Sequence, residues 1–359
     1  PGAAGRVPGA GYAARPVSPT SEVSELRPLA MGEMIDRAAT FWRSHLKPLF
    51  TLAFGFSLVN YIATKATTLG GQRLAPSLYG PDAQARAQQD PTGVMGEAGV
   101  SMALWMVLLV FLFWSYWMAT MAASRYVVSL QLGEPVPPAD GLRRAFSRMG
   151  ALTGAYLMSM AWAVLMTMLL LGPGAIFGGL AAAASVAGNN TLAVVLGVVA
   201  TLLAVLGLIA AMLWYFLRFM LLPPVMAMED LGAWEAFKRS GELLSGRIGP
   251  GFMGRVVVRA MVLYTVVSLI LISVQLVSGI PSWLVMAPYG SPFLDAGTMA
   301  RTPQLLLVPA ELVQVVAQSC FTPIYFVFCS LFYVDMRVRR EGLDLERRME
   351  TSPASTLAV

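Results

Sequence analysis

Long apolar runs alternate with shorter polar or amphipathic stretches along the whole of this chain. A helix needs about 20 mostly apolar residues to cross the hydrocarbon core of a bilayer, and each run reaches roughly that length. The six runs cover residues 49–69, 100–123, 152–171, 192–216, 256–277 and 307–333. The pattern therefore predicts an all-α integral membrane fold with six transmembrane helices.

Three shorter stretches place apolar residues at helical spacing on one side and charged residues on the other. They cover residues 31–49, 140–150 and 231–244. Amphipathic helices of this kind lie in the plane of the membrane interface. We expect Asp140 to cap the second helix, and Glu235 and Arg239 to form an i, i+4 pair on the third. Each stretch precedes two apolar runs, and this order favours a threefold hairpin repeat.

Small residues in the third and fourth runs predict how these helices end and pack. The third run ends at Gly172-Pro173-Gly174, so we expect the small-residue stretch 178–184 to form a separate re-entrant or surface piece. Small residues in the fourth run, such as Gly197 and Gly207, let helix backbones approach closely in lipid. This predicts that the fourth span is a packed, central helix.

Composition and charge support the membrane assignment and predict its orientation. Hydrophobic residues make up 57% of the chain and charged residues 13%, which is more apolar surface than one soluble core buries. The pI is about 9.4, but the basic residues alternate with the apolar runs and do not form a nucleic-acid-binding patch. By the positive-inside rule both termini are cytoplasmic, as an even number of spans requires. We expect the bacterial inner membrane as the location.

The distribution of charge and of small residues divides the chain into three parts. Residues 1–28 are rich in Pro, Gly and Ala, which predicts a flexible cytoplasmic arm. Residues 29–336 hold the six spans of the membrane domain. Residues 337–359 begin with a charged stretch and predict a basic cytoplasmic tail.

Residues able to carry enzymatic chemistry are scarce. His45 is the single histidine, and it falls on the first amphipathic stretch. Cys320 and Cys329 lie nine positions apart in the last run, on nearly opposite helix faces, so they do not bridge each other. No metal-ligand spacing, Ser/His/Asp set or phosphate-binding glycine motif occurs. We therefore expect no enzymatic activity, no metal and no cofactor.

Polar residues within the apolar runs offer a second kind of candidate site, because such groups are costly in lipid. Four neutral residues lie deep in the predicted spans: Asn60, Gln275, Gln314 and Gln318. Hydrogen bonds between helices explain them, and a solute path lined by Asn60 and Gln318 is the alternative. The ionisable residues Lys65, Arg255, Arg259 and Glu311 fall near predicted span ends, where we expect them to snorkel to the interface.

Basic residues also gather on the side predicted to be cytoplasmic. The candidate contacts with lipid headgroups or partner proteins are Arg143, Arg144, Arg148, Lys238, Arg239, Arg339 and Arg340. Near an anionic leaflet each exposed cation contributes about 1 kcal/mol of attraction. A role in setting topology alone explains the same residues.

Three stretches of the chain carry a family resemblance. The stretch 223–247, the stretch 333–346 (YVDMRVRREGLDLE) and the opening 26–37 resemble the membrane domain found fused to some bacterial glycerophosphoryl diester phosphodiesterases and in stand-alone multi-pass proteins. The resemblance implies a membrane domain without an established activity. In the fused relatives hydrolysis belongs to a separate soluble barrel with His, Glu and Asp metal ligands, so that activity does not transfer to this chain.

Two functions remain as hypotheses. The first is a non-enzymatic scaffold or accessory subunit of a membrane assembly, with anionic lipids and membrane proteins as partners and no nucleic acid. The alternative is a transporter of a small solute or lipid. A charged or wet cavity reached by Asn60, Gln275 and Gln318 would favour transport. Tight small-residue packing throughout would favour the scaffold.

Overall fold

The computed structural model describes residues 27–79, 89–134, 136–291, 298–343 and 345–346. No β-strand occurs in these ranges, which fold almost entirely into helices. The long helices are α2 (Leu46–Leu74), α5 (Pro91–Gln131), α7 (Met149–Val186), α8 (Asn190–Phe219), α11 (Val256–Met286) and α13 (Gln304–Glu341). The short helices are α1 (Met31–Ser44), α3 (Pro76–Tyr79), α6 (Pro138–Ser147), α9 (Leu222–Met228), α10 (Ala233–Leu244) and α12 (Thr298–Arg301), with 3-10 turns at Phe252–Gly254 and Ala287–Tyr289.

The six long helices are long and apolar enough to cross a bilayer, and each contains one predicted run. The chain is therefore a multi-pass α-helical membrane protein, as predicted. The helices are longer than the runs, since α5 has 41 residues, or about 60 Å of helix. A bilayer core is about 30 Å thick. The predicted arm lies outside the described residues except for Arg27 and Pro28, and α13 continues through the first residues of the predicted tail.

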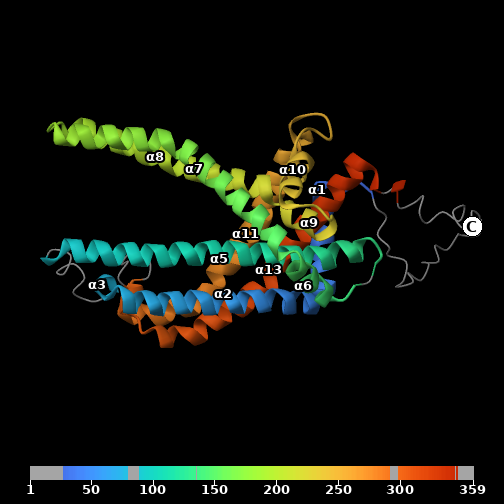
Figure 1. The fold of residues 1–359 in the computed structure, drawn as a ribbon, viewed down its shortest axis with the longest axis horizontal. Helices are drawn as coiled ribbons and strands as arrows, with labels where there is room; N and C mark the ends of the chain where they lie inside the picture. The colour runs from blue at the N-terminus through green and yellow to red at the C-terminus, as the bar shows by residue number, and fades with distance from the viewer. Residues whose placement is uncertain (1–26, 80–88, 135, 292–297, 344, 347–359) are drawn as a thin grey trace, which may run out of the picture.

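A short helix followed by two long ones occurs three times in the element order, in agreement with the expected hairpin repeat. Each short helix packs on the hairpin of another unit: α6 on α5, α10 on α7 and α8, and α1 on α13 and α11. The three units therefore interlock through their short helices (Figure 1). The N-cap of α6 is Pro137 and not Asp140, which lies in the first turn.

One end of the molecule holds most of the apolar core, and we call this end the base. It contains residues 117–128 of α5, 219–227 around α9 and 325–338 of α13, with the inner faces of α1, α6 and α10 packed against them. The central helix is α13 and not the predicted fourth span. In the most apolar 18-residue stretch of each helix, 61% of residues are buried in α13 but 6% in α8.

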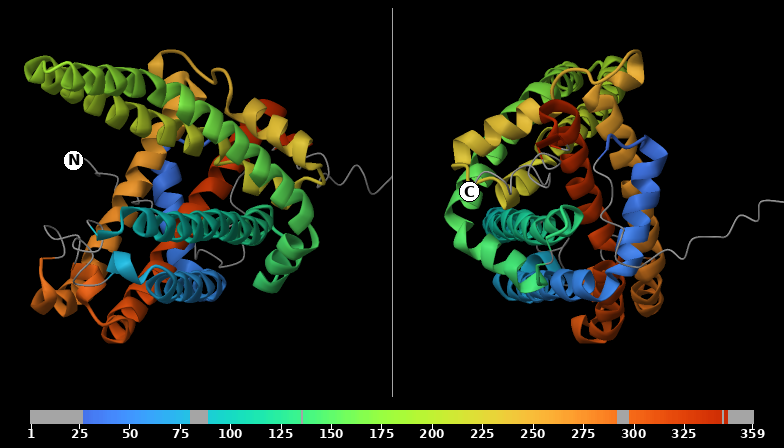
Figure 2. Two further views of the ribbon diagram at one scale, coloured as in Figure 1. Left: turned by 60° about the vertical axis from the view of Figure 1, so that its left-hand side comes forward. Right: turned by 90° about the vertical axis from the view of Figure 1, so that its right-hand side faces the viewer.

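The α7–α8 hairpin diverges from α5 as it runs away from the base (Figures 1 and 2). The helix α7 does not end at Pro173, which lies within it, and the stretch 178–184 continues the same helix. Gly207 and Ala204 of α8 do pack closely, but against α7, whereas Gly197 has no neighbour within 4 Å of its Cβ position. A Cβ atom on Gly207 would lie 2.4 Å from the Leu170 carbonyl oxygen, and one on Gly174 would lie 3.0 Å from the Ala204 nitrogen.

Gly207→Ala is expected to lower the free energy of unfolding by about 1–3 kcal/mol, because the added methyl group meets backbone that cannot move aside locally. Gly197→Ala is the matched control on the same helix, since nothing lies within 4 Å of its Cβ position. The control should raise stability by up to about 1 kcal/mol through helix propensity. Thermal unfolding of both variants in detergent measures the difference, and equal melting temperatures would contradict the close α7–α8 contact.

Candidate ligand-binding cavity

The base is held together by a buried ion-pair network around Asp335, which joins the stretches 26–37 and 333–346 to α11. Asp335 of α13 accepts a hydrogen bond from the backbone N–H of Leu29 at 2.8 Å. The Leu29 carbonyl oxygen accepts hydrogen bonds from Arg259 and Arg339. Both arginines also pair with Asp335, whose side chain is fully buried. Arg259 is therefore not a snorkelling residue, whereas Arg255 is exposed at the start of α11.

A second set of contacts joins α6, α10 and α13 around the acidic pair that follows α9. Asp230 accepts from Arg144 at 2.6 Å and from Arg148 at 2.9 Å. The hydrogen bond from Arg144 holds the pKa of Asp230 below its ordinary value. Glu229 accepts from Arg239 at 3.0 Å and from the hydroxyl of Tyr333 at 2.8 Å.

The candidate headgroup residues thus differ in how free they are. Arg239 pairs with Glu229 and Glu341, so the predicted Glu235–Arg239 pair is wrong, and Glu235 instead accepts from the N–H of Gly232. Arg144, Arg148 and Arg339 are occupied by the contacts above, and Arg340 donates to the carbonyl oxygen of Glu242. Arg143 and Lys238 are exposed, and Lys238 lies 3.9 Å from Glu242.

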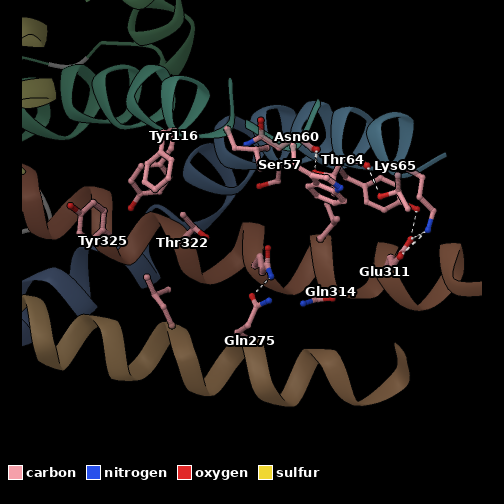
Figure 3. Close-up of a pocket in the computed structure, with 18 of the residues that line it drawn as sticks. Ser57, Asn60, Thr64, Lys65, Tyr116, Gln275, Glu311, Gln314, Thr322 and Tyr325 are labelled. Carbon is pink, nitrogen blue, oxygen red and sulfur yellow. Dashed lines mark hydrogen bonds and ion pairs between the residues drawn. The ribbon is translucent and has the colours of Figure 1, made fainter. Parts of the chain in front are cut away.

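Away from the base, a cavity of about 1080 Å³ lies among α2, α5, α11 and α13. All four polar residues predicted within the spans line it: Asn60, Gln275, Gln314 and Gln318 (Figure 3). Gln318 donates a hydrogen bond to Gln275 across the space between α13 and α11. The structure therefore brings residues of α11 and α13 together with Asn60 of α2, which is far from both in the sequence.

A continuous polar face on α2 forms one wall of the cavity. Its members recur at helical spacing: Ser57, Asn60, Tyr61, Thr64, Lys65, Thr68 and Gln72. They cover about 22 Å of helix at 1.5 Å per residue. The side-chain oxygen Oδ1 of Asn60 is buried without a hydrogen-bond partner, so this wall has an acceptor available for a ligand or water.

Lys65 and Glu311 form an ion pair in this cavity and do not snorkel. The Lys65 ammonium lies 2.7 Å from Oε2 of Glu311, and the two side chains are 13% and 24% exposed. Lys65 also donates to Oε1 of Gln304 at 3.1 Å, and the Tyr61 hydroxyl donates to Glu311 at 3.0 Å. These contacts draw α2 and α13 together and set a balanced pair of charges beside the neutral amides (Figure 3).

The end of the cavity nearer the base is aromatic. Its lining includes Phe113 and Tyr116 of α5, Phe216 of α8, Tyr264 of α11 and Tyr325 of α13. The ring centroids of Tyr116 and Tyr325 are 5.6 Å apart. The cavity is thus amphipathic, with a charged and polar end at Lys65 and an aromatic end at Tyr325 (Figure 3).

Metal-ligating and thiol side chains would form a second kind of site. No set of three His, Cys, Asp or Glu side chains there is placed to hold a metal ion. Cys320 and Cys329 are free thiols. His45 stacks on Phe41 with ring centroids 4.3 Å apart and lines no part of the cavity.

No protein-family model, curated protein or solved structure matches this chain. The resemblance to the membrane domain of glycerophosphoryl diester phosphodiesterases therefore stays a prediction.

Proposed function

We propose that this protein binds a small polar or amphipathic molecule in the cavity among α2, α5, α11 and α13 and moves it through or within the membrane. The observation that carries the proposal is the ion pair of Lys65 and Glu311 inside a large, polar-walled space between apolar helices. A charged cavity of this kind favours a transporter of a small solute or lipid over a scaffold.

Energetic cost supports a ligand-binding role for these residues. Charged groups within transmembrane helices are expensive, and they usually face a cavity or a path for a solute. Polar residues that only hydrogen-bond one helix to another would be few and in tight contact. Here a row of polar residues on α2 lines an open cavity. Ligand pockets typically have volumes of about 300–1,000 Å³, and this cavity, at about 1080 Å³, is slightly larger.

We infer the orientation of the membrane domain from the position of its arginines. Leu29 and Asp335 are in contact, so both ends of the described chain lie at the base. The positive-inside rule would put the base, with its arginines, in the cytoplasm of a bacterium. The exposed residues Arg143 and Lys238 would then face the anionic leaflet.

A scaffold or accessory subunit is the second candidate function. The α7–α8 hairpin favours it, because residues such as Met168, Leu169 and Leu206 are more than 60% exposed along its length. Lipid covers such a surface, and so would a membrane partner. The internal pairing of Arg144, Arg148 and Arg239 reduces the number of cations left for a partner.

Gln318→Trp tests the proposed function, because an indole at this position fills the middle of the cavity. The protein would be purified in a mild detergent, and its retained small molecules and lipids identified by mass spectrometry. We expect the wild type to retain one chemical class in a near-stoichiometric amount and Gln318→Trp to lose it. Val313→Trp is the matched control, because Val313 lies on the same helix outside the cavity and is 55% exposed. An identical retained set in all three proteins would contradict the proposal.

A further inference from the structure

The charges in the cavity carry information about the ligand. Apart from the tyrosines, the ionisable side chains that the described residues contribute to its lining are one cation, Lys65, and one anion, Glu311. This part of the lining therefore has a formal net charge of zero. A ligand with a net charge would leave one charge without compensation in a region of low dielectric constant, which is costly. A ligand without charged groups would form no ion pair with Lys65 or Glu311.

The geometry of the pair suits a ligand that carries both signs of charge. The Nζ atom of Lys65 and Oε2 of Glu311 are 2.7 Å apart, so each charge has its partner within the protein. A ligand ammonium at Glu311 and a ligand phosphate or carboxylate at Lys65 would exchange one ion pair for two. Tyr61 and Gln304 flank the two charges and can keep a hydrogen bond to each during the exchange.

The length of the cavity argues for an apolar part on the same molecule. Glu311 and Tyr325 lie fourteen positions apart on α13, and both line the cavity. At 1.5 Å per residue they are separated by about 21 Å along the helix. Between them the wall changes from charged groups through Asn60 and Gln318 to aromatic rings. A compact zwitterion would fill the charged end alone.

We propose that the cavity selects a zwitterionic amphiphile, with its head between Lys65 and Glu311 and its apolar part toward Tyr116 and Tyr325. This inference rests on the proposed function and names its substrate class. Two kinds of molecule carry these groups. One is a zwitterionic phospholipid, through its headgroup and first chain atoms, and the other is a soluble amino acid with an apolar side chain. The length of the cavity favours the phospholipid.

The test is a binding competition with defined probes. The wild-type protein in detergent micelles is titrated with phosphatidylethanolamine or phosphatidylglycerol, and occupancy is measured by native mass spectrometry. Soluble leucine is the third probe, measured by the shift in melting temperature and by displacement of lipid. We expect phosphatidylethanolamine to bind at least about tenfold more tightly than the anionic lipid, which corresponds to about 1.4 kcal/mol.

Two variants test whether this pair of charges causes the preference. The double substitution Lys65→Met with Glu311→Gln should reduce the ratio of the two lipids to about one. The exchange Lys65→Glu with Glu311→Lys keeps both charges and should retain the preference. Both variants keep the side-chain length close to that of the wild type, and their melting temperatures report whether they fold.

A lipid preference that the neutral pair abolishes supports a phospholipid, and leucine binding that the neutral pair abolishes supports the soluble source. Equal binding of both lipids without leucine binding, or a preference for the anionic lipid, would overturn the inference. If the lipids fail this test but Gln318→Trp still abolishes their binding, the proposed function stands and only the ligand class is wrong. If Gln318→Trp leaves binding unchanged, the proposed function and the ligand class are both wrong.

Discussion

Asp335→Asn is expected to lower the free energy of unfolding by about 3–5 kcal/mol, the usual cost of removing one partner from a buried ion pair. Asparagine keeps the shape and an oxygen acceptor for the Leu29 N–H. It removes the negative charge that compensates Arg259 and Arg339, which lie 3.5 and 3.0 Å from the Asp335 carboxylate. Because the Asp335 side chain is fully buried, water cannot take over this role.

Two readouts separate this effect from a general loss of stability. Thermal or denaturant unfolding in detergent measures the total change. Limited proteolysis near Leu29 measures release of the N-terminal segment, which Asp335, Arg259 and Arg339 hold by its backbone. Asp230→Asn is the matched control, since the Asp230 side chain is 83% exposed and its ion pairs are screened by water. A change of less than about 1 kcal/mol in Asp335→Asn would show that the buried network does not hold the base.

Lys65→Met and Glu311→Gln are each expected to destabilise the protein by about 2–3 kcal/mol, because each leaves a mostly buried charge without its partner. The double variant should be destabilised by clearly less than the sum of the two. A double-mutant cycle measured by thermal unfolding gives the coupling, which we expect to be about 1–3 kcal/mol. Because the Lys65 and Glu311 side chains are partly exposed to the cavity, each single substitution should destabilise the protein less than Asp335→Asn does.

The same cycle at a lipid-facing pair supplies the control. Leu305 and Leu312 are exposed on α13 at 79% and 38% and have no charge to compensate. Their alanine variants should show additive effects within about 0.5 kcal/mol. Additive effects of Lys65→Met and Glu311→Gln would show that the two side chains do not interact in the folded protein.

The membrane helices were predictable because span length and apolar composition are local properties of the chain. The burial of each helix was not. The prediction that the fourth span is central relied on its small residues, but Gly207 packs against α7 within the same hairpin and Gly197 has no neighbour within 4 Å of its Cβ position. In lipid the most apolar helix has no reason to be buried, since acyl chains are as apolar as leucine. The mean hydropathy of the most apolar 18-residue stretch is 2.9 for α8 and 1.7 for the buried α13.

The candidate site was predictable in part for the same reason. Asn60, Gln275, Gln314 and Gln318 stand out because a polar residue in an apolar run is visible without any partner. Lys65 and Glu311 were misread as snorkelling residues, because their partnership joins positions 246 residues apart. The spacing of the polar residues on α2 was a signal that could have predicted a polar wall. Which helices lie opposite that wall depends on packing between segments that are distant in the sequence.

The most direct test of the account is whether the space beside Gln314 and Gln318 is a polar cavity within the membrane. In a background with Cys320→Ser and Cys329→Ser, Gln314→Cys and Val313→Cys would each be exposed to a charged, membrane-impermeant thiol reagent in reconstituted vesicles. Gln314 lines the cavity, and its neighbour Val313 lies outside it and is 55% exposed. The account predicts modification of Gln314→Cys, slowed by bound ligand, and protection of Val313→Cys by lipid. Protection of both thiols, or equal modification of both, would contradict it.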